Sequence, residues 1–297
     1  MASLQKQIIR LTAQILNKLV SPKLISSWVF RYKFGRFINW NNPQDLNEKI
    51  NWLKFNTDTE QWTRLADKYA VREFVEQCGL KDLLVKLYGV WDDADNIDFE
   101  SLPQQFVLKS NNGSGDIIIV KDKSKEDLEQ LRKRCAKMLK TNYGVVLSET
   151  HYYKIPRKII AEELLDATKQ SAQSKSLIDY KIWCFNGKPY CVLTVANRES
   201  GTCELDSFDI NWNHQREMMT YAGHIKHPTL LVPRPTSLDK MLEAATIMSK
   251  GHPQVRVDFY EIDGKPYFGE LTFTSNGGFM RYYTQKALLE MGQQIRL

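Results

Sequence analysis

The sequence contains no run of eighteen apolar residues, so we expect no transmembrane helix. Its first twenty residues are interrupted by Gln, Lys, Arg and Asn, and they therefore lack the apolar core of a signal peptide. Internal repeats, low-complexity tracts and long linkers are also missing. These absences favour a protein that works in the cytoplasm.

Cysteine is scarce and never occurs as a Cys-x-x-Cys pair. The five cysteines are odd in number and scattered, which favours reduced structural thiols and argues against a zinc site. Four of the five histidines lie in loop-like regions without metal-ligand spacing, so we assign none of them a metal. The cysteines are residues 78, 135, 184, 191 and 203, and these four histidines are residues 151, 214, 224 and 227.

The composition is that of a globular protein. Hydrophobic residues make up 42% of the sequence and aromatic residues 11%. The length of 297 residues is enough for one large or two ordinary domains. The net charge of +6 suits an anionic partner such as a nucleotide, an acidic sugar, a membrane face or a nucleic acid. Because the basic residues are interleaved with acids, we expect no nucleic-acid partner.

The most informative stretch is residues 256–279, RVDFYEIDGKPYFGELTFTSNGGF, which predicts two strands around an Asp263-Gly264 turn. In the first strand Arg256, Asp258 and Tyr260 alternate with apolar residues, and in the second Phe268, Glu270 and Thr272 are predicted to share a face. Two carboxylates and an arginine are costly to bury on a hairpin unless they hold an ion. A solvated hairpin with surface charges is the alternative.

The register decides whether Asp258 and Glu270 meet. A two-residue loop pairs Val257 with Glu270 and puts the two carboxylates on opposite faces. A three-residue loop, Ile262 to Gly264, pairs Arg256 with Glu270 and brings Asp258 diagonally near it, at roughly 7–8 Å between Cβ atoms. A hard cation can bridge carboxylates at that separation, and we predict this second register.

Residues 105–120, QFVLKSNNGSGDIIIV, predict a strand that ends near Lys109, a flexible loop and a second strand. Gly113 and Gly115 allow backbone conformations that direct successive N–H groups at one anion, which is typical of a phosphate loop on a hairpin. The stretch lacks the spacing and the helix of a Walker motif. An ordinary hairpin turn explains Asn-Gly-Ser-Gly equally well, although the preceding lysine favours the phosphate loop.

Several helices are predicted from capping and periodicity. Residues 3–20 have an apolar stripe and a basic polar face, which indicates a helix packed on the domain or one that contacts a membrane or a partner. Asp45 and Glu48 form a capping box, and Asp67 is a good N-cap for the next helix. Lys68 lies at that helix start, where the helix dipole disfavours a cation, so the sequence indicates a contact with an anion.

Residues 157–167 predict a strand that runs into a polar hinge, and residues 179–195 predict a hairpin on Asn186-Gly187. The first strand of that hairpin places Asp179, Lys181 and Trp183 at alternate positions. Residues 197–235 are rich in Trp, His and Pro and predict an irregular loop or insertion over the site. Residues 237–250 predict an amphipathic helix.

Six segments, taken in order, resemble the ATP-grasp superfamily, and specifically its teichuronopeptide-biosynthesis (TupA-like) family. They are NPQDLNEKINWLKFN, LADKYAVREFV, FVLKSNNGSG, IIAEELL, DYKIWCFNGKPY and RVDFYEIDGKPYFGELTFTSNGGF. The resemblance implies an α+β, ATP-grasp fold in which two lobes clamp ATP. It divides the chain into a helical N-terminal region (1–65), a small lobe with phosphate loop and hinge (66–170) and a large lobe with the metal site (171–297).

The resemblance also implies roles for individual residues. Lysines would contact the phosphates, the Gly-rich loop would close over them, and the hinge would lie beside adenine. Asp166 or Asp179 would take the ribose. Two carboxylates would hold Mg²⁺, and an arginine would face the transferred phosphoryl group. The nucleotide-binding residues are Lys68, Lys109, Asn112, Gly113, Ser114, Gly115, Glu162, Glu163, Leu164, Leu165, Asp179 and Lys181; the metal ligands are Asp258, Glu270 and Asn276; and the catalytic residues are Arg256 and Lys109.

The sequence departs from the family pattern at three places. Thr272 stands where ATP-grasp ligases commonly have a metal-binding Asn, so Asn276 or water would replace it. Asn112 precedes Gly113 where the family loop often has His. Helices within residues 3–60 replace the usual Rossmann-like N-terminal domain, which leaves the binding mode of the second substrate open.

The function implied is an ATP-dependent carboxylate–amine ligase that acts through an acyl phosphate. Family context suggests a uronic acid of a bacterial surface polysaccharide as the carboxylate and an amino acid as the amine. The N-terminal helix would contact membrane-bound polysaccharide machinery at the inner membrane face. One alternative is a glycosyltransferase, although Asp206 and Asp209 are three residues apart and so do not form the Asp-x-Asp metal motif frequent in that class. The other is a non-catalytic ATP- or glycan-binding scaffold.

Overall fold

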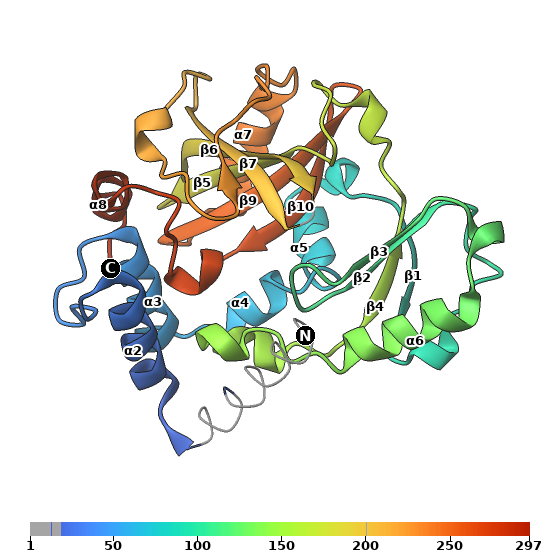
Figure 1. Cartoon of the computed structure of the whole chain (residues 1–297), viewed down its shortest axis with the longest axis horizontal. Coiled ribbons are helices and arrows are strands. Elements are labelled where there is room, and N and C mark those ends of the chain that lie inside the picture. Colours follow the sequence, from blue (N-terminus) through green and yellow to red (C-terminus); the bar gives the residue numbers. More distant parts are fainter. Residues whose placement is uncertain (1–12, 14–18, 200) are drawn as a thin grey trace. The chain divides into compact units, whose positions relative to one another are not determined.

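The computed structural model describes residues 13, 19–199 and 201–297 and divides the chain into two compact units (Figure 1). Unit 1 draws on Met1–Val29, Asp58–Phe74 and Val85–Leu165, and unit 2 on Phe30–Thr57, Val75–Leu84 and Asp166–Leu297. The three consecutive domains expected from the sequence do not coincide with these units, because the chain passes between them several times. The predicted helix over 3–20 lies almost entirely outside the described residues.

The described part of unit 1 contains a four-stranded antiparallel sheet in the order β1-β4-β2-β3. Its strands are β1 (Leu87–Trp91), β2 (Phe106–Ser110), β3 (Ile117–Val120) and β4 (Ile159–Glu162). The helices of this unit include α4 (Glu60–Leu65) and α6 (Leu128–Leu139), while α2 (Pro22–Phe34) and α5 (Val71–Gln77) begin in unit 1 and end in unit 2. The strands on either side of the Gly-rich loop are as predicted.

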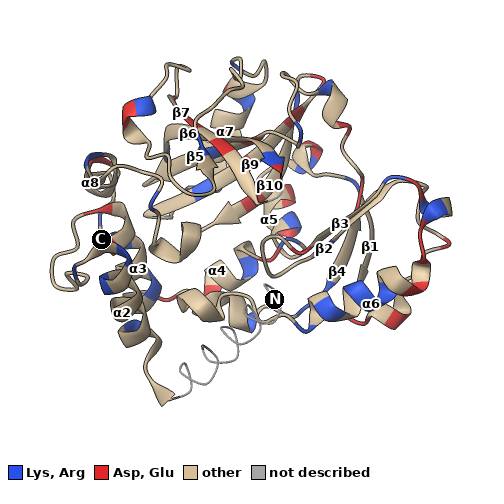
Figure 2. Cartoon of the chain, viewed as in Figure 1, with Lys and Arg blue, Asp and Glu red and all other residues tan. Residues whose placement is uncertain are grey.

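The two faces of the unit 1 sheet differ. One face packs against α6, where Leu131, Cys135 and Met138 join apolar side chains of β2, β3 and β4 in a buried core. Alternation along the strands directs Lys109, Ile117, Ile119 and Glu162 to the opposite face. Figure 2 shows that Lys and Arg are frequent along α6.

The described residues of unit 2 form a six-stranded sheet in the order β10-β9-β5-β6-β7-β8. Its strands are β5 (Asp179–Phe185), β6 (Lys188–Glu199), β7 (Thr202–Asp209), β8 (Ile225–Lys226), β9 (Gln254–Ile262) and β10 (Lys265–Thr272). The helix α7 (Leu238–Met248) packs on this sheet, and α3 (Leu46–Asn56) packs against α8 (Gln285–Gln293). The helix predicted over 237–250 is thus confirmed.

Short 3₁₀ helices connect these elements. They are η1 (Lys81–Leu83), η2 (Ala94–Asn96), η3 (Lys123–Lys125), η4 (Val145–Leu147), η5 (Thr150–Lys154), η6 (Ala167–Lys169), η7 (Arg216–Met218) and η8 (Ser275–Gly278). Within the described residues, no helix combines the length and the apolar character that crossing a membrane requires. The five cysteines, all of them described, are free thiols.

The irregular segment predicted over 197–235 is partly wrong. The strand β6 continues to Glu199, and β7 pairs with it in antiparallel register. The sequence of β7 conceals a strand because it buries an acid: Asp206 is 2% exposed and accepts hydrogen bonds from Arg216, with His214 Nδ1 3.2 Å from its Oδ2. Arg216 and His214 therefore offset the cost of burying the Asp206 carboxylate, a cost that makes a buried strand look unfavourable when only the local sequence is considered.

The register predicted for the hairpin of β9 and β10 is wrong, although Asp258 and Glu270 still lie near each other on one face of the sheet. The turn has two residues, Asp263 (φ 50°) and Gly264 (φ 70°), and Ile262 pairs with Lys265. A β-bulge between Phe268 and Glu270 then shifts the register by one residue. Glu270 consequently lies directly opposite Asp258.

The same bulge breaks the alternation along β10. Phe268 pairs with Phe259 and packs edge to face against it at 6.4 Å between ring centroids, so it faces the core and not the carboxylates. Thr272 pairs with Arg256 on the face of Glu270. The predicted shared face therefore holds for Glu270 and Thr272 and fails for Phe268.

Helix α3 positions the chain segment that follows β10. Its capping box of Asp45 and Glu48 is present as predicted, and Arg36 forms ion pairs with both carboxylates at 2.5 Å. Farther along the helix, Asn51 donates to the carbonyl of Gly278 at 2.8 Å, and Lys54 donates to that of Gly277 at 3.0 Å. A polar stripe of α3 therefore anchors the backbone around η8.

Replacement of Gly278 by Ala should destabilise the protein by about 3 kcal/mol. Gly278 has φ +80°, and an added Cβ would lie 2.6 Å from Asn51 Nδ2 and 3.0 Å from Ile50 Cγ2. Gly251 is the matched control, because it has φ +84° with nothing within 4 Å of its Cβ position, so Gly251→Ala should cost only about 1 kcal/mol. Denaturant unfolding of both variants measures the difference, and equal losses would contradict the close packing.

Candidate active site

In unit 1, Glu162 binds two cations on the sheet face away from α6. Its Oε2 lies 2.8 Å from Lys109 Nζ, and its Oε1 lies 3.1 Å from Arg72 Nη1. Arg72 also donates to the carbonyl of Val85 at 2.8 Å. The side chain of Glu162 is 9% exposed and that of Lys109 22% exposed, so the carboxylate is the inner partner and the ammonium group reaches toward solvent.

The predicted phosphate loop, residues 111–116, lies at the end of β2 and is contacted by Lys68. The ammonium group of Lys68 donates to the carbonyl of Gly113, and its backbone N–H donates to that of Asn111 at 3.0 Å. Gly113 lies against the ring of Tyr143, where an added Cβ would meet the ring at 3.0 Å. Gly115 has φ +87°, the left-handed conformation that glycine adopts without strain.

Other residues of this loop differ in exposure. Asn112 is 3% exposed, whereas Ser114 and Gly115 are exposed at the loop tip. The strand after the loop exposes two isoleucines beside Lys109: Ile117 is 49% exposed and Ile119 is 54% exposed. This face of unit 1 thus combines an apolar surface with the lysine and the loop, a pairing that suits a ligand with a flat apolar part and an anionic part.

The predicted hinge, residues 162–165, ends unit 1. Glu162 closes β4 and directs its carboxylate to Lys109 and Arg72, while the N–H of Glu163 donates to the carbonyl of Lys86 at 2.9 Å. Leu164 and Leu165 are half-buried, and unit 2 resumes at Asp166. The assignment of these backbone groups to adenine stays a prediction.

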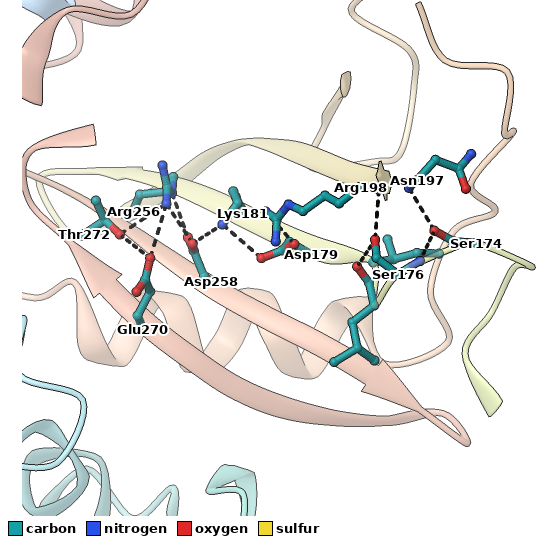
Figure 3. Close-up of polar contacts among 12 residues, drawn as sticks. Ser174, Ser176, Asp179, Lys181, Asn197, Arg198, Arg256, Asp258, Glu270 and Thr272 are labelled. Atoms are coloured by element: carbon teal, nitrogen blue, oxygen red, sulfur yellow. Dashed lines mark hydrogen bonds and ion pairs between the residues drawn. The ribbon is translucent and has the colours of Figure 1, made fainter. Parts of the chain in front are cut away.

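In unit 2, the sequence-predicted residues of β5 and β9 form one connected row of charges (Figure 3). Arg256 Nε and Nη2 each donate to the carboxylate of Asp258 at 2.7 Å. Lys181, which pairs with Asp258 across the strands, donates to its Oδ2. Side-chain exposure is 3% for Asp258, 9% for Lys181 and 10% for Arg256, so the row is almost fully removed from water.

Residues of β10 and η8 complete the surroundings of Arg256. Its Nη2 donates to Thr272 Oγ1 at 3.2 Å and lies 3.7 Å from Glu270 Oε1, and its Nη1 donates to Ser275 Oγ at 2.5 Å. Thr272 Oγ1 in turn donates to Glu270 Oε1 at 3.3 Å. Thr272 therefore orients Arg256 and Glu270 relative to each other.

The row continues beyond Lys181 to Asp179 and Arg198. Asp179 Oδ1 lies 3.1 Å from Lys181 Nζ, and its Oδ2 lies 2.8 Å from Arg198 Nη2. The carboxylate of Asp179 is 4% exposed, so it is turned into the protein and toward its two cations. The ribose contact that the resemblance implies for Asp179 stays a prediction; in this structure its carboxylate is engaged by Lys181 and Arg198.

These ion pairs set the ionisation of the site. Burial by itself raises the pKa of Asp258, but the charges and hydrogen bonds of Arg256 and Lys181 outweigh it and lower the pKa to about 2. Burial disfavours the cationic form of Arg256 as well, but the neighbouring Asp258 carboxylate outweighs this effect and raises the pKa of Arg256. Both groups are therefore charged at neutral pH.

The carboxylates of Asp258 and Glu270 fit a magnesium site. They are hard oxygen donors on one face, directly opposite each other across the strands, and the side chain of Glu270 is 28% exposed. The described residues contain no cluster of three His, Cys, Asp or Glu residues that could hold a metal. Mg²⁺ does not need a third acid, because it keeps several waters and binds one or two carboxylates together with substrate phosphates.

Asn276, the third predicted metal ligand, lies in η8 with φ 48°. Its side chain is exposed, and its amide donates to the carbonyl of Phe279 at 3.1 Å. The metal-binding role of Asn276 stays a prediction.

Sequence reasoning missed four contributors to these sites: Arg72, Arg198, Tyr143 and Ser275. Arg72 had a signal, since it lies four residues after Lys68 within the same motif.

A model of the TupA-like ATP-grasp family matches residues 48–296 of the chain. The chain belongs to this family. Its fold is therefore the α+β, ATP-grasp fold that the six sequence segments predicted. The residues matched by the family model lie in both units. No curated protein matched this TupA-like chain by sequence.

Several solved structures are similar to this TupA-like protein. D-alanine–D-alanine ligase from Bacillus anthracis has 16% identity and a TM-score of 0.45, with 78% of this chain and 67% of the ligase covered. The ligase of the same name from Helicobacter pylori has 11% identity and a TM-score of 0.45, with 85% and 67% covered. The ATP-grasp ligase PsnB, complexed with a minimal precursor, has 14% identity and a TM-score of 0.42, with 81% and 64% covered.

The chain spans only part of the length of the solved structures to which it is similar. It spans 54% of the B. anthracis ligase in the structure complexed with ATP, at 13% identity, a TM-score of 0.40 and 71% coverage of this chain. A PsnB structure contains Mg and ADP.

We expect the loop 111–115 to be mobile without nucleotide and to become ordered when ATP binds, because Gly-rich phosphate loops close over their ligand. Amide hydrogen exchange across this loop should slow on addition of ATP and Mg²⁺. The Lys109→Met variant is the control, since loss of the cation beside the loop should remove most of the protection. Exchange that is already slow without nucleotide would contradict the prediction.

The pKa of Asp258 predicts a defined acid response. Because its pKa is lowered in the folded state, ionised Asp258 stabilises the protein above about pH 4, and this contribution is lost as the pH falls toward 2. At pH 5, Asp258→Asn should be less stable than the wild type by about 3–5 kcal/mol. Chemical denaturation from pH 5 to pH 2 should show this gap narrowing below pH 4; a constant gap would contradict the assignment.

Proposed function

We propose that this ATP-grasp protein is an ADP-forming carboxylate–amine ligase. The observation that carries the proposal is the buried row of Arg256, Asp258 and Lys181 with Glu270 beside it, in a chain of the ATP-grasp family. The row places two cations, Arg256 and Lys181, next to two carboxylates that suit Mg²⁺. A phosphoryl-transfer site needs this combination, because charge develops on the phosphoryl oxygens as the bond to ADP breaks.

The residues of unit 1 would bind the nucleotide. Lys109 and Lys68 would contact phosphate oxygens, and the loop of residues 112–115 would cover the phosphates with its N–H groups. The exposed side chains of Ile117 and Ile119 would pack on the adenine ring. Glu162 would hold Lys109 in place before the nucleotide arrives, so that little reorganisation is needed.

The residues of unit 2 would act on the transferred group. Arg256 would bind an oxygen of the γ-phosphate and would later stabilise the oxyanion of the tetrahedral intermediate. Lys181 would bind a second phosphate oxygen. Magnesium held by Asp258 and Glu270 would neutralise phosphate charge and polarise the phosphoryl group. Ser275 and Thr272 would keep the guanidinium group oriented.

The reaction has two steps that balance. A substrate carboxylate oxygen attacks the γ-phosphorus and the bond from that phosphorus to the β–γ bridging oxygen breaks. ADP is released, and the substrate becomes an acyl phosphate. An amine nitrogen then attacks the acyl carbon, the C–O bond to phosphate breaks, and the nitrogen loses a proton. Neither step needs a side-chain nucleophile, so bound cations and alignment of the substrates account for the catalysis.

For the substrates we propose a uronic acid of a bacterial surface polysaccharide or its precursor, and an amino acid or another amine. Membership of the TupA-like family supports this choice, and the net charge of +6 suits an acidic sugar. We further propose that the protein works in the cytoplasm, where ATP is available, with its N-terminal segment in contact with the polysaccharide machinery at the membrane.

The decisive experiment measures ADP and phosphate release with Mg²⁺ and ATP, against a panel of uronic acids crossed with amino acids. Release that requires both substrates, with an amide detected by mass spectrometry, is the expected result. Turnover of sugar nucleotides without consumption of ATP would overturn the proposal in favour of a glycosyltransferase. Nucleotide binding without any turnover would favour a scaffold.

The Glu270→Gln variant should lose ADP release by at least a hundredfold, because it removes one of the two carboxylates that suit Mg²⁺. The matched control is Glu290→Gln in α8, whose carboxylate is 45% exposed and pairs at 3.9 Å with Lys286 on the surface. The control should keep wild-type turnover, and both variants should keep the wild-type melting temperature. Full turnover in Glu270→Gln would refute the metal assignment.

A further inference from the structure

Lys181 lies between two buried carboxylates, of which only Asp258 has a role in the proposed reaction. Its ammonium group is 3.1 Å from Asp179 Oδ1 and contacts Asp258 Oδ2. Asp258 is a proposed ligand of Mg²⁺, whereas Asp179 is paired on its far side with Arg198 (Figure 3). The same lysine thus neutralises a metal ligand and a carboxylate outside the metal site.

The backbone fixes this arrangement. Asp258 is the cross-strand partner of Lys181 in the pairing of β5 with β9, and Asp179 lies two residues before Lys181 on the same face of β5. The ammonium group already bridges the two carboxylates, so a small rotation of the long Lys181 side chain can leave it on Asp179 alone without any change in the strands. The carboxylates themselves are 3% and 4% exposed and have little freedom to move.

The charges explain why Lys181 would have to move. Asp258 already accepts two hydrogen bonds from Arg256 as well as one from Lys181. A divalent cation at Asp258 would add two positive charges beside two existing ones in a setting that water screens poorly. Arg256 is held by Thr272 and Ser275 as well, and the second carboxylate near it, Glu270, is itself a proposed Mg²⁺ ligand. Lys181 is therefore the cation with a carboxylate partner outside the metal site.

We propose that Lys181 is a placeholder cation, which pairs with Asp258 when the metal is absent and shifts onto Asp179 when Mg²⁺ binds. Asp179 is then a positioning residue that retains Lys181 near the phosphates and not a ribose ligand. The inference rests on the proposed function for its metal site. It adds a role for Asp179 and Arg198, which the reaction as described does not use.

The test measures binding of Mn²⁺ alone, followed by the electron paramagnetic resonance signal of the free ion. Lys181→Met removes the competing cation and should tighten Mn²⁺ binding on the order of tenfold. This is the change in an equilibrium constant that corresponds to a charge interaction worth one pKa unit. Asp179→Asn leaves Lys181 with Asp258 as its carboxylate partner and should weaken Mn²⁺ binding by a similar factor. Opposite shifts from two neighbouring substitutions are not expected from a general loss of structure.

A third variant keeps the test valid if Asp179→Asn folds poorly. Arg198→Met removes a side chain that is 46% exposed and leaves Asp179 with a stronger hold on Lys181, so Mn²⁺ should bind more tightly, as in Lys181→Met. The matched controls are Lys188→Met, at an exposed position beginning β6, and Asp263→Asn, in the exposed β9–β10 turn. Both controls should bind Mn²⁺ as the wild type does.

Other outcomes separate this inference from the proposed function. Unchanged or parallel shifts in Lys181→Met and Asp179→Asn would overturn the placeholder role and leave the ligase proposal intact. Absence of Mn²⁺ binding in the wild type and in Lys181→Met would also overturn it, because removal of the competitor should expose the site. Binding that persists in Glu270→Gln would instead contradict the metal assignment on which both rest.

Discussion

The pairing of Asp258 with Arg256 and Lys181 is the interaction on which the charged face of unit 2 depends. A carboxylate that is 3% exposed is strongly unfavourable without its cations, so the ion pairs and the strand register stabilise each other. If β5 slipped by one residue on β9, Lys181 would move to the apolar face and Asp258 would lose a partner. The charges therefore specify the register as well as the chemistry.

Unit 1 uses the same principle on a smaller scale. There a single carboxylate, Glu162, binds Lys109 and Arg72, and the lysine stays partly accessible while the acid is buried. In both units a buried acid is paired with the cations that are proposed to contact phosphate. Cations that are held before a phosphate arrives lose little entropy on binding it, and this preorganisation is what the proposed phosphoryl transfer requires.

The sequence predicted the elements around the site better than it predicted their pairing. The capping box at Asp45, both strands beside the Gly-rich loop and the Asn186-Gly187 hairpin are present, because each depends on neighbouring residues. The register of β9 and β10 was wrong because the bulge at Gly269 depends on packing, with Phe268 directed to Phe259 in the core. The strand β7 was missed because Asp206 is buried with Arg216, a partner in a later segment.

The sequence by itself determined membership of the ATP-grasp family and the residue types of the site, since motifs, glycines and charged pairs can be identified along the chain. Only the tertiary structure decided which carboxylate faces which cation. It paired Asp179 with Lys181 and Arg198, and it placed Glu270 opposite Asp258 through a bulge. The physical reason is that pairing of buried charges depends on distances across strands, and those distances follow from register, bulges and packing.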